Sequence, residues 1–198
     1  MTTIEEPGER APAPEPVRLV QRFVNTVDLE GGPEILPDAA ALRTWLREAG
    51  LLGPREQVTA QGHARAIELR EALRALAYAN GGHEPDPRAV EIVNDAARRA
   101  GLQPLLSDPA HASLEPTAGG LDAALGRIVA AVHAGIADGT WPRLKACERD
   151  TCRWAFYDHS RNRAGHWCSM AVCGSREKNR RAYRRRRSRE AGRGRGRG

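Results

Sequence analysis

Apolar side chains recur at helical spacing through most of the first 140 residues of this 198-residue chain. In each such segment hydrophobic residues return every three or four positions and charged residues fill the positions between, a pattern typical of amphipathic helices. Capping residues, prolines and glycines mark the ends of the segments. The predicted helices span about residues 19–27, 38–49, 59–79, 86–100 and 121–137.

Two shorter apolar runs, residues 102–106 and 112–116, flank a turn sequence and predict a small β-hairpin. The helix that follows, residues 121–137, is apolar on most sides, so we expect it to lie at the centre of a bundle. His133 lies on this helix. We interpret it as a hydrogen-bonded core residue, and not as a metal ligand or a base.

The last quarter of the chain follows a different pattern. Residues 153–158 have the composition of a strand, with Trp154 and Phe156 on one face, and residues 160–165 supply the turn of a predicted hairpin. Residues 174–189 contain good helix formers and no proline or further glycine, which predicts a basic helix. The fold class is therefore α+β, mostly α.

These patterns divide the chain into four parts. Residues 1–16 are acidic and rich in proline and predict a disordered leader, while the Gly-Arg repeats of residues 191–198 predict a disordered tail. Between them lie a mostly helical N-terminal domain with its small β-hairpin, residues 17–140, and a small module, residues 141–190.

Charge separates the same two halves. Residues 1–140 hold 13 Arg and 20 Asp or Glu, a net charge of −7, whereas residues 141–198 hold 18 Lys or Arg and 5 acidic residues, a net charge of +13. Such an asymmetry indicates a polyanionic partner for the C-terminal part alone.

All four cysteines of the chain lie in this basic part, with the spacing Cys147-x4-Cys152-x15-Cys168-x4-Cys173. Two close pairs separated by a loop of hairpin length suit a tetrahedral Zn²⁺ site, in which four thiolates leave no position for water. We therefore predict one structural zinc ion per chain. Two disulfides, four unrelated thiols, or a ligand from His159 or His166 in place of one cysteine are the alternatives.

The arginine-rich residues around and after the last cysteine are the candidates for nucleic-acid contacts. Arginine offers forked contacts to phosphates and guanine edges, and dense like charge would be neutralised by a polyanion. A merely solvated basic face is the alternative. The candidate residues are Arg161, Arg163, Arg176, Lys178, Arg180, Arg181, Arg184, Arg185, Arg186 and Arg187.

The first 140 residues show no pattern that predicts catalysis. They contain no cysteine, their histidines are scattered, and their Gly-Gly doublets do not sit between a strand and a helix. The acidic residues Asp28, Glu30 and Glu34 are interpreted as a solvated loop, with a polar pocket as the alternative. We expect no enzymatic activity. No apolar run approaches the roughly 20 residues that span a bilayer, and we expect a cytoplasmic protein without membrane contact.

The C-terminal module resembles a known family. Trp167-Cys168-Ser169-Met170 and Cys173-Gly174-Ser175-Arg176 are similar to the CGNR zinc finger of bacterial proteins, which has a zinc-ribbon or treble-clef-like fold; Ser175 stands where the family name has Asn. Phe23–Asp28 and Leu69–Arg74 resemble the ABATE-type domain that accompanies this finger in proteins classed as stress-induced transcription regulators. The resemblance implies zinc on the four cysteines, nucleic-acid binding and a role in transcription.

These observations lead to one main hypothesis and one alternative. The chain is predicted to be a zinc-dependent DNA-binding transcription regulator whose N-terminal domain senses a small-molecule effector or mediates association, for example as a homodimer. The alternative is an RNA-binding zinc-ribbon-like protein, in which Trp154, Tyr157 or Trp167 stack on the bases of single strands.

Overall fold

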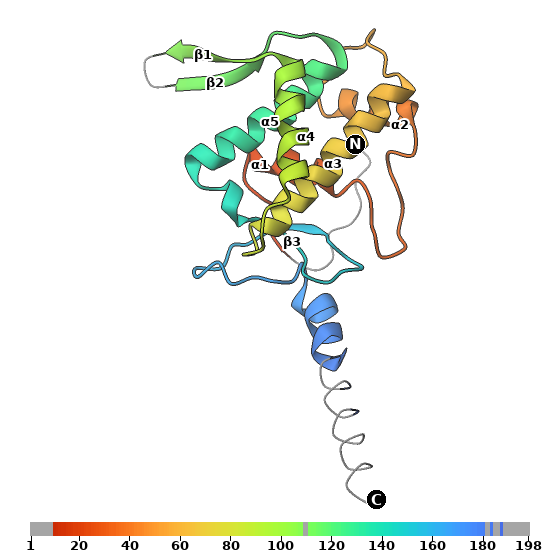
Figure 1. Cartoon of the computed structure of the whole chain (residues 1–198), viewed down its shortest axis with the longest axis vertical. Helices are drawn as coiled ribbons and strands as arrows, with labels where there is room; N and C mark the ends of the chain where they lie inside the picture. Colours follow the sequence, from red (N-terminus) through yellow and green to blue (C-terminus); the bar gives the residue numbers. More distant parts are fainter. Residues whose placement is uncertain (1–9, 109–110, 181–182, 184–186, 188–198) are drawn as a thin grey trace, which may run out of the picture.

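The computed structural model describes residues 10–108, 111–180, 183 and 187. A body of packed helices forms most of the molecule, with a β-hairpin at one end and a small module at the other, from which a helix leads away (Figure 1). The N-terminal and C-terminal parts predicted from the sequence therefore lie at different ends of the molecule.

The predicted helices are all present. Asp38, Thr59 and Asp86 cap three of them, because each side chain accepts a hydrogen bond from a backbone N–H of the first turn. Gly101, in the left-handed conformation with φ 59°, ends one helix as a C-cap glycine should. The helices are α1 Val17–Val24, α2 Ala39–Glu48, α3 Ala60–Ala79, α4 Pro87–Ala100 and α5 Gly120–Asp138.

The core of the helical body lies between the five helices, and α2 contributes Leu42, Trp45 and Leu46, with the Trp45 ring against Phe23 of α1. Helix α5 contacts α1, α4 and the hairpin, which confirms its predicted central place. The prediction for His133 was wrong: the residue is exposed, on the side of α5 that also carries the exposed Ile136.

Helix α5 is also the one helix of the described residues that is long and apolar enough to span a bilayer, but 56% of its apolar window is buried inside the protein.

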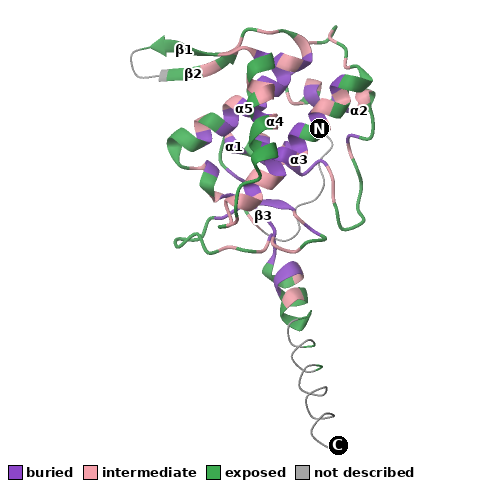
Figure 2. Cartoon of the chain, viewed as in Figure 1, coloured by how far each residue is buried: buried purple, intermediate pink, exposed green. Residues whose placement is uncertain are grey.

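Strands β1 (Leu102–Asp108) and β2 (His111–Pro116) form the predicted antiparallel hairpin, with Leu102 opposite Pro116. Most described residues of the hairpin are exposed, and it projects from the helical body (Figures 1 and 2). It lies far from the cysteines at the opposite end of the molecule.

The C-terminal module contains a second hairpin, but not the predicted one. Strand β4 (Ala155–Tyr157) pairs with β3 (Leu144–Ala146), which precedes it, and residues 160–165 form a turn without a following strand. A short 3-10 helix, Trp141–Arg143, leads into β3. Strand β3 was missed because it is only three residues long, and an alternating sequence pattern cannot be recognised over so few positions.

The prediction of a disordered leader was wrong for residues 10–16, and residues 1–9 lie outside the described part. The Arg10 guanidinium donates hydrogen bonds to the carbonyl oxygens of Cys168, at 2.8 Å, and Trp167, at 2.9 Å, and stacks over the Phe156 ring. Ala13 is buried, and its N–H donates to Gln21. Composition indicated disorder, but this segment is tied down by tertiary contacts with the C-terminal module.

Candidate metal centre and nucleic-acid interface

Strand β4 joins two hydrophobic cores through the alternation of its side chains. Ala155 and Tyr157 pack into the core of the helical body, whereas Trp154 and Phe156 pack around the cysteines. The predicted shared face of Trp154 and Phe156 is confirmed. The metal centre is thus attached directly to the helical domain by one strand.

The four cysteines converge on one buried point. Cys147 follows β3 and Cys152 precedes β4, so the turn between the strands supplies the first pair. Cys168 precedes a helical turn, Met170–Gly174, and Cys173 lies within that turn. Ser169 caps the turn by accepting a hydrogen bond from the Val172 N–H. Two ligands thus come from the turn of the β3–β4 hairpin and two from the start of a helix, and the four predicted cysteines lie together.

The spacing of the sulfur atoms suits zinc. The four Sγ atoms lie within 4.8 Å of one another, and Cys152–Cys168 and Cys168–Cys173 are each 3.6 Å apart. Zn–S bonds of about 2.3 Å in a tetrahedron place the sulfurs about 3.8 Å apart. The residues therefore fit one Zn²⁺ with four thiolate ligands, a closed site in which the ion is structural.

The electrostatics of the cluster also call for a cation. Hydrogen bonds from Cys152 and Cys168 lower the pKa of the Cys147 thiol. The contacts with Cys147 raise the pKa of Cys152 and of Cys168, because a second negative charge beside the Cys147 thiolate is unfavourable. Four sulfurs this close cannot all ionise on their own. A divalent ion would remove that conflict.

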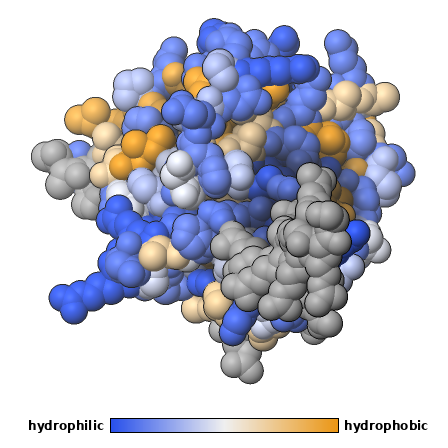
Figure 3. All heavy atoms as spheres, turned by 60° about the horizontal axis from the view of Figure 1, so that its bottom comes forward, coloured by the Kyte–Doolittle hydropathy of each residue, from blue (hydrophilic) through white to orange (hydrophobic). Residues whose placement is uncertain are grey.

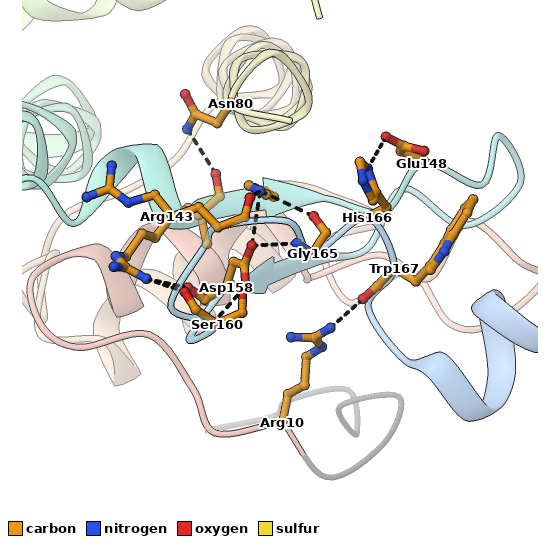
Figure 4. Close-up of polar contacts among 12 residues, drawn as sticks. Arg10, Asn80, Arg143, Glu148, Asp158, Ser160, Gly165, His166 and Trp167 are labelled. Atoms are coloured by element: carbon orange, nitrogen blue, oxygen red, sulfur yellow. Dashed lines mark hydrogen bonds and ion pairs between the residues drawn. The ribbon is translucent and has the colours of Figure 1, made fainter. Parts of the chain in front are cut away.

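Neither alternative set of contacts is found. All four cysteines are free thiols, not disulfides. One ring nitrogen of each histidine has a partner elsewhere: His159 Nε2 lies 3.1 Å from the Ala11 carbonyl oxygen, and His166 Nδ1 lies 2.6 Å from Glu148 Oε1. Neither histidine belongs to the cluster of potential ligand atoms, which consists of the four cysteines; Figure 4 shows His166 directed toward Glu148.

A buried ion pair holds the loop between the second and third cysteines. Asp158 is fully buried, and one of its carboxylate oxygens accepts from Lys145 Nζ at 3.0 Å and from the Gly165 N–H at 2.8 Å (Figure 4). The other oxygen accepts from the Ser160 N–H and hydroxyl. Lys145 Nζ also donates to the carbonyl oxygens of Arg163 and Gly165. These contacts fix residues 158–165, the turn that carries Arg161 and Arg163.

The candidate nucleic-acid residues within the described part are all exposed. They are Arg161, Arg163, Arg176, Lys178, Arg180 and Arg187. Residues 175–180 continue the first turn as an α-helix, here called the finger helix, and Ser175 Oγ donates to the Met170 carbonyl oxygen as a cap. Arg181 and Arg184–Arg186, like the Gly-Arg tail, lie outside the described residues. The end of the molecule that bears the finger is mostly hydrophilic (Figure 3).

Two of the three aromatic residues considered for base stacking are core residues. Trp154 and Tyr157 are buried, so neither ring is available to a base. Trp167 is half-buried and lines a shallow groove of about 650 Å³ beside the exposed Met170 and Lys178. Only Trp167 therefore remains a candidate for stacking.

The acidic loop has a role that the sequence pattern did not show. Glu34 makes a two-pronged ion pair with the buried Arg70, with both N–O distances 2.8 Å. Glu30 Oε1 lies 2.5 Å from a guanidinium nitrogen of both Arg149 and Arg176. The predicted solvated loop is present, since residues 29–34 are exposed, but the ion pairs of Glu30 and Glu34 were not predicted. Their partners are more than 30 residues away along the chain, and no local signal links them.

Taken together, a helical domain joined to a closed four-cysteine centre with a basic helix defines a zinc-finger protein. Residues 17–139 match the ABATE family, described as "Putative stress-induced transcription regulator", and residues 143–187 match the CGNR zinc finger. The chain belongs to the ABATE family, with a CGNR zinc finger at its C-terminal side, and the resemblance seen in the sequence is confirmed. No match is found among curated proteins.

Proposed function

We propose that this chain is a zinc-dependent DNA-binding transcription regulator that acts in the cytoplasm. The observation that carries the proposal is the finger helix: it leaves directly from the cysteine centre, and its cations Arg176, Lys178 and Arg180 are exposed. The matches to a transcription-regulator family and to a zinc finger support the same function.

Each part of the module would have a distinct task in this function. Zinc on the four cysteines would lock the helix start to the β3–β4 hairpin, so that the direction of the helix is set before DNA arrives. The turn that carries Arg161 and Arg163 is held by Asp158, on the same module. Two cationic elements of defined geometry would then contact the phosphate backbone, which gives affinity and orientation but no sequence preference by itself.

The helical domain would regulate or assemble the protein and not catalyse a reaction. A cavity of about 210 Å³ between α3, α4 and α5 has an apolar floor that includes Leu69 and Leu125 and a charged rim that includes Arg65 and Asp122. Such a site suits a small effector with both apolar and charged groups. Association of two chains through this domain would present two fingers to DNA.

DNA affinity is expected to fall steeply as salt concentration rises. If about six phosphates are neutralised, the binding constant should drop on the order of 10³-fold between 50 and 200 mM salt, because bound counterions are released from the DNA. Fluorescence anisotropy with a labelled duplex measures this slope. Lys178→Gln should make the slope shallower by about one. Arg55→Gln, an exposed cation remote from the finger, should leave it unchanged. A binding constant that ignores salt would contradict the proposal.

RNA binding through Trp167 is the second candidate function, favoured by its half-buried ring beside Lys178. Under this alternative, Trp167→Ala should weaken binding of a single-stranded RNA about 5- to 150-fold and keep the zinc content, since one base–aromatic stack is worth about 1–3 kcal/mol. Trp154→Ala is the contrasting variant, because it removes a buried ring and should destabilise the fold by about 3 kcal/mol. If duplex DNA displaces single-stranded RNA from the wild-type protein, and Trp167→Ala binds RNA as tightly as the wild type, this candidate function is contradicted.

A further inference from the structure

One carboxylate of the helical domain sits between two arginines of the finger. Glu30 Oε1 lies 2.5 Å from Arg149 Nη1 and 2.5 Å from Arg176 Nη1. Arg149 comes from the turn between the first two cysteines, and Arg176 comes from the finger helix. Two guanidinium groups from separate elements therefore converge on a single oxygen atom.

The loop that presents Glu30 is held by the helical domain. Residues 27–34 fold back on themselves, since Val27 and Glu34 form an isolated antiparallel β-bridge and the Asp28 N–H donates to the Pro33 carbonyl oxygen. Within the loop, the Glu30 N–H donates to Asp28 Oδ1 at 2.9 Å. The base of the loop is fastened to α3, where the buried Arg70 binds Glu34 through both carboxylate oxygens. The position of Glu30 is thus set by the helical domain and not by the finger.

The two arginines present cationic nitrogens to one oxygen atom: Arg176 Nη1 donates a hydrogen bond to Glu30 Oε1, whereas Arg149 Nη1 lies 2.5 Å from that oxygen as an ion pair and has no hydrogen-bond partner. A phosphodiester carries its charge on two non-bridging oxygens, and guanidinium groups recognise such oxygens by the same short, charge-assisted hydrogen bonds that they make to carboxylates. The site lies at the start of the finger helix, and Arg180, four residues after Arg176, lies on the same side of that helix. A backbone phosphate at this point would lie on the side of the finger helix that also carries Arg180.

We propose that Arg149 and Arg176 form a phosphodiester-binding site of the finger and that Glu30 occupies it as an intramolecular competitor. This inference rests on the nucleic-acid-binding function proposed above. Nucleic acid must displace the carboxylate before the site can take a phosphate. The ion pairs are partly exposed, with 55% of the Arg176 side chain and 29% of the Glu30 side chain accessible, so displacement is feasible.

The competition couples the two parts of the protein. Any event in the helical domain that withdraws the loop of residues 27–34 would free both arginines and strengthen binding to nucleic acid. By thermodynamic linkage, bound nucleic acid would favour the withdrawn loop to the same degree. Regulation of the finger would then require no movement of the metal centre.

The test is the isosteric substitution Glu30→Gln, which removes the charge and keeps the size of the side chain. Binding of a labelled duplex at low salt should tighten about 3- to 10-fold, and the salt dependence should become steeper by about one, because the arginines no longer carry a tethered counter-charge. Glu115→Gln, which removes one negative charge from the remote β-hairpin, is the matched control and should bind like the wild type. Zinc content should equal that of the wild type in both variants.

A double-mutant cycle isolates the proposed site. In an Arg176→Gln background, Glu30→Gln should bring at most half of its gain, since one of the two arginines is gone. Equal affinities of the wild type and Glu30→Gln would overturn the inference, as would a gain matched by Glu115→Gln or fully kept without Arg176. A wild-type protein that binds no nucleic acid at all would instead contradict the proposed function, so the two failures are distinguishable.

Discussion

Replacing Cys168 with serine is expected to remove the zinc ion and to unfold the finger around it. Cys168 is buried, and its sulfur lies 3.6 Å from those of both Cys152 and Cys173. A serine hydroxyl is a poor zinc ligand. Because the free energy of binding a structural zinc is about 10–16 kcal/mol and contributes directly to folding, the loss should far exceed the effect of other single substitutions in the module.

Metal analysis of the purified protein should give about one zinc per wild-type chain and well under half of that for Cys168→Ser. Binding of a DNA duplex should weaken at least 100-fold, and a strong chelator should produce the same loss in the wild type. Thr151→Ser, an exposed change in the turn between the first two cysteines, is the matched control and should keep the zinc. A serine variant that retains one zinc and the wild-type circular dichroism spectrum would refute the assignment of the four ligands.

The second large effect is expected from Asp158→Asn. The substitution keeps the shape of the side chain but leaves the Lys145 ammonium group buried without its counter-charge, since both side chains are at most 6% exposed. Breaking a buried ion pair by removing one partner costs about 3–5 kcal/mol. The free energy of unfolding in urea, measured with zinc present, should fall by that amount.

An exposed ion pair of the same module provides the control for that measurement. Asp150 pairs with Arg153 at 2.8 Å, but 74% of the Asp150 side chain is accessible. Asp150→Asn should therefore cost less than about 1 kcal/mol. If both variants are equally stable, the buried pair does not anchor the loop. Combining Asp158→Asn with Lys145→Met should recover part of the loss, because it removes the stranded charge.

The same pair predicts a dependence of stability on pH. Burial alone would raise the pKa of Asp158, but hydrogen bonds from Ser160, Lys145 and Gly165 outweigh it and hold this pKa below the ordinary value of 3.8. Ionised Asp158 therefore stabilises the folded state at neutral pH. Its contribution should decline as the pH falls below about 3.8, and Asp158→Asn should lack this part of the acid transition.

Features encoded locally were predictable from the sequence. Helix ends depend on residues within one turn of them, as with the N-caps Asp38 and Asp86 and the C-cap Gly101. The zinc site was predictable from the spacing of the two cysteine pairs. Packing across the chain was not predictable in the same way. His133 lies on an apolar helix, but which side of that helix faces the core depends on its neighbours in space.

The candidate site divides in the same manner. The metal ligands and the exposed cations of the finger helix were predicted, but the opposing carboxylate of Glu30 was not. Its contact with Arg176 joins residues 146 positions apart, and an acidic loop carries no signal of such a partner. The anchoring role of Asp158 was missed for a related reason, since only burial distinguishes it from a surface aspartate.

The hydrogen bonds between the helical body and the β3–β4 hairpin have a consequence for how such a chain can be rearranged. Asn25 satisfies both the N–H and the carbonyl oxygen of Ala155, and Asn80 binds the carbonyl oxygens of Trp141 and Leu144. In a finger transplanted alone onto another protein, these backbone groups would lose their hydrogen-bond partners, and the side of β4 that packs on the helical body would be exposed. Moving this finger into another protein would therefore destabilise it, and we expect the two parts to occur together in one chain.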